Sequence, residues 1–144
     1  MRALHLRPTL AATALLLALG AGPAVAAGQA AHAAALQACP KVKDEIVDLD
    51  RLAEGLKNSS AVSLFEKLRL KSAIDDLIGR FKAFHRNNKQ FTLAELQEQY
   101  DLLMMRIARE LQDKDVTLHG QVCNAWESIW ATLQDRSRFL EKFS

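Results

Sequence analysis

The sequence predicts an all-α fold: an antiparallel up-down-up-down four-helix bundle that follows a cleaved N-terminal signal peptide. Apolar residues recur with helical spacing in four successive segments, and no segment alternates apolar and polar residues over more than a few positions. The connections between these segments are short, and short connections join antiparallel neighbours. Six glycines and three prolines in 144 residues are too few for a turn-rich β-sandwich or a disordered tail.

Residues 1–26 have the three parts of a secretory signal peptide. Arg2 and Arg7 make the start basic, residues 10–19 are almost wholly apolar, and residues 24–26 read Ala-Val-Ala, a small-residue cleavage site. A Gly-Ala-Gly-Pro stretch interrupts the apolar run after about ten residues, whereas a membrane span needs about 20. We therefore expect export by a Sec-type pathway, cleavage after the last of these alanines or the next one, and a periplasmic or secreted mature protein without a stable membrane span.

The segment Leu36-Gln37-Ala38-Cys39 offers a minor alternative, because it matches part of a lipobox. A lipid attached to Cys39 would anchor the protein to a membrane. Gln37 fits a lipobox poorly, however, and Gln29 and His32 separate the cysteine from the apolar run. Export in a soluble form remains the leading prediction.

The charge balance argues against a nucleic-acid partner. Arg2 and Arg7 are two of the 19 basic residues, and the predicted signal peptide contains none of the 17 acidic ones. The mature chain is therefore neutral, with 17 groups of each sign, whereas nucleic-acid binders carry an excess of Lys and Arg. Its length leaves room for one domain with one modest core.

An alanine-rich lead-in over residues 27–39 precedes the bundle domain, which is predicted over residues 40–144. The first helix is expected to begin at Pro40, a favourable first-turn residue, and to end at Asn58-Ser59-Ser60. Its apolar residues fall on one stripe, at spacings of four and three: Val42, Ile46, Leu49, Ala53 and Leu56.

Two capping boxes predict the next two helix starts. Ser63 is followed three residues later by Glu66, and Thr92 by Glu95. We expect the second helix over about 63–86 and the third to end near Gln112. Their predicted core faces consist of Leu70, Ala73, Ile74, Leu77, Phe81 and Phe84 in the second helix, and Leu96, Tyr100, Leu103, Ile107 and Leu111 in the third.

The fourth helix follows the turn at Asp113-Lys114-Asp115. Its core stripe is predicted to contain Leu118, Val122, Trp126, Ile129 and Leu133. The segment Asp135-Arg136-Ser137 leaves open an interruption before Phe139, Leu140 and Phe143. Charge also distinguishes the middle helices: residues 66–89 hold seven basic and three acidic groups, and residues 95–115 hold six acidic and three basic ones. We expect a modest, salt-screened attraction between these helices.

Cys39 and Cys123 are the two cysteines of the chain, and both belong to its exported part. An oxidising compartment favours a disulfide between them, which would stabilise the fold by roughly 2–4 kcal/mol. Counting helical rise leaves Cys123 about 10 Å from the start of the first helix, more than the roughly 7 Å between α-carbons that a disulfide allows. Cys39 precedes Pro40, however, so a lead-in folded along the fourth helix would close the gap, and the count does not exclude the bond. A metal site built on these cysteines is the rival, but the spacing favours neither metal nor haem, and we predict no cofactor.

An apolar patch at the start of the second helix conflicts with its core face. Val62, Leu64, Phe65 and Leu68 centre about 180° away from the stripe between Leu70 and Phe84. Three interpretations remain open: a short separate helix over residues 61–69, cover by the alanine-rich lead-in, or an exposed surface used for association. Met105, opposite the core stripe of the third helix, is a second exposed apolar candidate.

His119 is the most unusual polar residue, because it lies in the apolar arc of the fourth helix one turn before Cys123. It could act as a ligand or as a base toward the Cys123 thiol, unless that sulfur is oxidised. Trp126 and Trp130, one turn apart, are typical of core packing. No carboxylate interrupts a core stripe, and the arginines project away from the stripes, so the convergent polar groups of an enzyme interior are missing.

We therefore expect a non-enzymatic, exported helical bundle with one disulfide, whose specific role the sequence does not reveal. It would bind another protein or itself, in the second case as a homodimer. The alternative is a small-molecule or cofactor binder, or an enzyme, that uses the interior near His119, Trp126 and Trp130.

Overall fold

The computed structural model describes residues 32, 33, 39 and 49–144. Within residues 49–144 the regular elements are all helices: α2 (Leu49–Asn58), α3 (Leu64–His85), α4 (Leu93–Leu111), α5 (Val116–Gln134) and α6 (Arg136–Phe143). The predicted all-α fold class is therefore confirmed for the described part of the chain. The predicted signal peptide over 1–26, most of the lead-in over 27–39 and the first half of the first predicted helix lie outside it.

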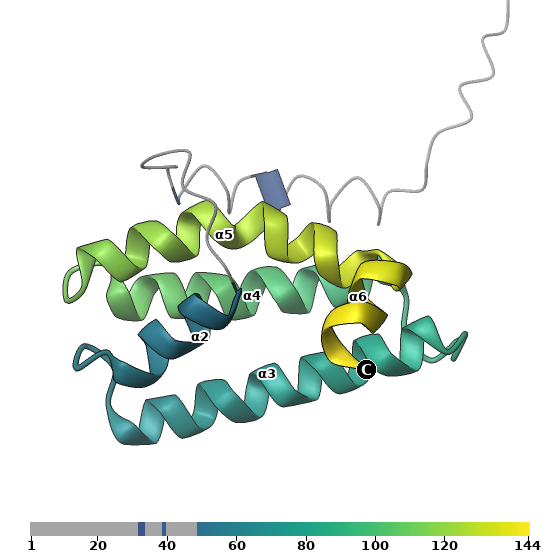
Figure 1. Cartoon of the computed structure of the whole chain (residues 1–144), viewed down its shortest axis with the longest axis horizontal. Coiled ribbons are helices and arrows are strands. Elements are labelled where there is room, and N and C mark those ends of the chain that lie inside the picture. The colour runs from purple at the N-terminus through teal and green to yellow at the C-terminus, as the bar shows by residue number, and fades with distance from the viewer. Residues whose placement is uncertain (1–31, 34–38, 40–48) are drawn as a thin grey trace, which may run out of the picture.

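The three long helices α3, α4 and α5 follow the long axis of the molecule, the shorter α2 runs obliquely beside them, and α6 lies across one end (Figure 1). Helix α4 packs against both α3 and α5, while α2 and α6 each pack against α5. Helix α5 is therefore the central element, since it touches α2, α4 and α6. No helix of the described residues is long and apolar enough to cross a membrane.

The predicted fourth helix is divided into α5 and α6 at Asp135. This residue has extended dihedral angles, and its side chain accepts a hydrogen bond from the amide of Arg138, so it serves as the N-cap of α6. The division lets α6 turn back toward α3 and bury Phe139 completely. The described residues thus contain five helices instead of the four predicted.

Helix α2 turns a different face inward from the one predicted. Leu52 is buried and Leu49 and Leu56 are half-buried, but Ala53 is exposed, so its place in the predicted stripe is wrong. A close approach to α5 explains the difference. A β-carbon at Gly55 would lie only 2.7 Å from Cδ1 of Leu118, which is too close. Because glycine has no β-carbon, α2 and α5 can pack together on the side of Leu52 and Gly55.

The two predicted capping boxes have different outcomes. Thr92 and Glu95 form the complete reciprocal box at the start of α4. Ser63 caps α3 by accepting from the amide of Glu66, but the Glu66 carboxylate pairs with Arg106 of α4 at 2.7 Å. Glu66 therefore joins α3 to α4, because the guanidinium of Arg106 offers its carboxylate a charged partner.

The core runs through the interior between α3, α4, α5 and α6. Most of the predicted core residues are buried, and the largest fully buried side chains include Trp126, Tyr100, Phe81 and Phe139. His85 is buried among the aromatic rings, and its Nε2 lies 2.7 Å from the carbonyl oxygen of Leu133. This contact ties the end of α3 to the end of α5.

Candidate functional site

Three large apolar side chains are exposed on the first two turns of α3. Leu64 is 76% exposed, Phe65 63% and Leu68 59%. We call these three residues the α3 patch. Neighbouring apolar side chains on a surface, unlike scattered ones, are typical of interaction sites.

Two of the residues predicted for this patch do not belong to it. Val62 is only 3% exposed and belongs to the hydrophobic core; it precedes the N-cap Ser63 and so is not part of helix α3. Its prediction as a surface residue is wrong. Met105 is half-buried and packs against the core from α4, so it does not extend the exposed surface.

The described residues exclude one of the three interpretations of the conflicting apolar face and agree with another. Helix α3 is continuous from Leu64 to His85, so the separate helix over residues 61–69 is wrong. No described residue covers the α3 patch. Of the lead-in, His32 is described, and it lies instead against Asp101 and Trp130. An exposed surface is the interpretation that agrees with these observations.

The α3 patch stands on a firmly held stretch of helix. Glu66 pairs with Arg106 of α4, and the ammonium group of Lys67 donates to the carbonyl oxygen of Lys57 at the end of α2. On the patch itself, the guanidinium of Arg69 lies 4.3 Å from the centre of the Phe65 ring, within the range of a cation–π contact. These contacts join the start of α3 to α4 and to the end of α2, and Arg69 puts a positive charge at the edge of the patch.

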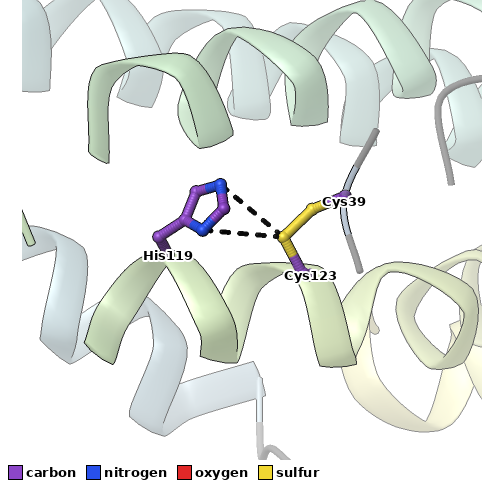
Figure 2. Close-up of a disulfide and its surroundings, with 3 residues drawn as sticks. All are labelled: Cys39, His119 and Cys123. Atoms are coloured by element: carbon purple, nitrogen blue, oxygen red, sulfur yellow. Dashed lines mark hydrogen bonds between the residues drawn. A yellow bond between two sulfur atoms is a disulfide. The ribbon is translucent and has the colours of Figure 1, made fainter. Parts of the chain in front are cut away.

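Cys39 and Cys123 form the predicted disulfide, with their α-carbons 5.2 Å apart. The described cysteines are therefore both oxidised, and Cys123 is not available as a nucleophile. His119 lies one helical turn earlier on α5, and its Nε2 and Nδ1 are 3.8 and 4.0 Å from the sulfur of Cys123 (Figure 2). The interpretation of His119 as a base acting on a free thiol is wrong for this oxidation state.

The interior near His119, Trp126 and Trp130 is filled with protein. Trp126 is 1% exposed, and its indole N–H donates to Asp101 at 3.0 Å. Trp130 packs its ring against the rings of Tyr100 and Phe81. The two tryptophans thus serve as core residues, and this geometry does not favour the alternative of a ligand site between them.

Asp101 is one of three buried polar residues of the described chain, with Ser59 and His85, whose burial was not predicted. It is only 5% exposed, accepts a hydrogen bond from Trp126 and lies 2.8 Å from Nδ1 of His32. The expectation that no carboxylate enters the core is therefore wrong. The available signal was its position seven residues before Ala108, which places both residues on the same side of α4 at the edge of the core stripe.

Tyr100 forms the second polar contact of this region. Its hydroxyl donates to the backbone carbonyl of Trp126. Burial, and secondarily the negative charge of Asp101, raise the pKa of Tyr100 well above its ordinary value. The phenol therefore stays protonated and keeps donating, which makes this contact a structural link between α4 and α5.

An open cleft of about 520 Å³ lies at the turn between α3 and α4. Phe84 and Phe91 contribute apolar walls, and Lys89 and Arg136 contribute positive charge. None of the predicted site residues lines this cleft.

No family model matches the chain, and no curated protein or solved structure is significantly similar to it. The function therefore has to be argued from the geometry of this molecule.

Proposed function

We propose that the protein is an exported, non-enzymatic helical-bundle protein, stabilised by one disulfide, that acts by binding another protein or a second copy of itself. The observation that carries this proposal is the α3 patch. Burying three large apolar side chains in a partner would gain roughly 1.5–3 kcal/mol for each. A contact of that kind belongs at the centre of an interface, with Arg69 and the neighbouring charges at its rim.

The surroundings of the patch support a binding role. The ion pair between Glu66 and Arg106 and the bond from Lys67 to the end of α2 hold this part of α3 in place before any partner arrives. A preorganised surface loses less conformational freedom on association, so more of the contact energy appears as affinity.

The proposal is tested by replacing Phe65 and Leu68 together with serine in the mature protein. We expect the double variant to lose self-association in sedimentation equilibrium, or to lose the partner captured by the wild type in a pull-down. The matched control is Leu140→Ser, which removes an exposed leucine from α6, where it is 44% exposed. This control should leave association unchanged.

The same experiment can refute the proposal. If the double variant loses its helical circular dichroism while its association is unchanged, the two side chains support the fold and the α3 patch is not an interface. Equal losses of association in the double variant and in Leu140→Ser would also argue against a specific surface.

Export is the second part of the proposal, and its support is the signal peptide predicted over residues 1–26. The protein would be periplasmic or secreted, an environment in which a disulfide persists. Mass spectrometry of the protein purified from its natural host should give a chain that begins after Ala26 or Ala27. An intact N-terminus would contradict export with cleavage, and a lipid-modified Cys39 would favour the lipoprotein alternative.

We also infer an up-down-up-down order for the four longer helices, α2 to α5. The short connections between them support this order, because a few residues can join antiparallel neighbours but cannot return along a whole helix.

A further inference from the structure

The two cysteines and His119 form a cluster that has the composition of a metal site. One nitrogen of His119 and the sulfurs of Cys39 and Cys123 lie within 4.8 Å of one another. His119 and Cys123 project from the same face of α5, one turn apart, and Cys39 reaches them from 84 positions away in the sequence (Figure 2). We propose that reduction of the disulfide converts this cluster into a Cys₂His site for one zinc ion.

The distances suit a tetrahedral zinc ion. With Zn–S of about 2.3 Å and Zn–N of about 2.0–2.1 Å, tetrahedral angles separate the sulfur and nitrogen ligands by roughly 3.6 Å. The Nε2 of His119 is already 3.8 Å from the Cys123 sulfur. Among the described residues, the Cys123 sulfur is the hydrogen-bond partner of the His119 imidazole. The imidazole therefore needs to break no other hydrogen bond in order to bind a metal ion. The sulfurs would separate to roughly 3.8 Å, which rotation about the Cα–Cβ bonds can provide.

The chemistry balances in two steps. A thiol reductant transfers two electrons and two protons to the disulfide, which yields two cysteine thiols and the disulfide of the reductant. Zinc then displaces the two thiol protons and binds two thiolates, together with a nitrogen of neutral His119. Three protein ligands leave the fourth position to a water molecule.

Burial is compatible with an occupied site, because the zinc complex carries no net charge. Cys39 is 4% exposed and Cys123 2%, so without a metal the reduced cysteines stay as neutral thiols. A zinc ion with two thiolates and a neutral imidazole is also neutral, so zinc binding leaves no uncompensated charge in this place. Two thiolates and one imidazole are also ligands that suit zinc over hard cations such as Mg²⁺.

The test is a titration of the mature protein with Co²⁺ and then Zn²⁺ under anaerobic conditions, after reduction with a phosphine that is removed beforehand. We expect one Co²⁺ per chain, with the visible bands of tetrahedral cobalt and a thiolate charge-transfer band, and displacement of the cobalt by zinc. His119→Ala should weaken zinc binding at least tenfold. The oxidised wild type is the matched control and should bind neither metal at this site.

Each outcome decides the proposal. Zinc affinity that is equal in wild type and His119→Ala, or cobalt spectra without thiolate bands, would overturn it. The reduced chain could also lose its fold, and circular dichroism then gives the second readout. Refolding by zinc in the wild type, but not in His119→Ala, supports the site, whereas failure of zinc to restore helicity refutes it.

Discussion

The two ends of α3 have opposite environments, although one continuous helix forms both. At its end, Phe81 is fully buried and His85 is 6% exposed. Helix α6 turns back and packs Phe139 against both rings, with centroid distances of 6.0 Å to Phe81 and 4.8 Å to His85. At its start, the α3 patch has no such cover from the described residues. The comparison shows that α6 adds to the cover of the last turns of α3, whereas the described residues place no such helix over its start. Apolar residues of one helix can therefore be core or surface, according to which other helix packs over them.

The largest expected effect is the removal of the cover. Phe139→Ala would cost about 3–5 kcal/mol of the free energy of unfolding, because it deletes a fully buried ring that packs on Phe81 and His85. Chemical denaturation followed by circular dichroism measures this loss. A cost below 1 kcal/mol would show that α6 does not hold the covered end together.

Opening the disulfide is expected to have the next largest effect. Cys39→Ser combined with Cys123→Ser should lower the free energy of unfolding by about 2–4 kcal/mol, since the long loop closed by the bond restricts the unfolded chain. The bond joins Cys39 to α5, whereas the patch is on α3, so association through the patch should persist under conditions in which the variant is folded. Loss of association by the folded variant would mean that the two regions are coupled.

Asp101 offers an intermediate effect in the polar part of the core. Asp101→Ala leaves the buried indole N–H of Trp126 without its acceptor and removes the partner of His32, so we expect a loss of about 1–3 kcal/mol. Asp101→Asn is the matched variant, because its amide oxygen can still accept from Trp126. Equal losses in denaturation experiments on the two variants would contradict the assigned bond.

The pH dependence of unfolding reports on the same region through Tyr100, the single tyrosine of the chain. The pKa of Tyr100 is raised in the folded state. The contribution of this group to the free energy of unfolding is therefore fully present below the unfolded pKa of about 10, and it is lost as the pH rises toward the folded pKa. Above pH 10 the free energy of unfolding should fall by up to about 1.4 kcal/mol per pH unit from this group. Tyrosinate absorbance should appear together with unfolding, and its appearance in the folded protein would contradict the burial.

The smallest expected effect belongs to the uncovered start of α3. Leu68→Ala should change the free energy of unfolding by no more than about 0.5 kcal/mol, as is typical of surface positions. Leu77→Ala in the same helix is the matched variant, and it should cost about 2–5 kcal/mol because Leu77 is buried. Similar losses in the free energy of unfolding for the two variants would contradict the difference in burial between Leu68 and Leu77.

Much of the fold could be predicted, but the site could be predicted only in part. The apolar periodicity located the helices, and the start of α4 followed from Thr92 and Glu95. The composition also identified Cys39 and Cys123 as partners. The sequence could not show that Glu66 would leave its capping position for Arg106, because that choice depends on a residue of another helix. In this pair, the acidic Glu66 comes from the predominantly basic segment 66–89, and the basic Arg106 comes from the predominantly acidic segment 95–115.

The sequence by itself determined features that depend on neighbours within one or two helical turns: the helical period, the Ser63 N-cap and the capping box of Thr92 and Glu95. It left the break at Asp135 open. The tertiary structure alone decided which faces are covered. It buried Val62 and Asp101, left Leu64 and Phe65 exposed and brought Cys39 close to His119. The physical reason is that burial depends on which distant helix packs over a side chain, and that contact is not encoded in the residues next to it.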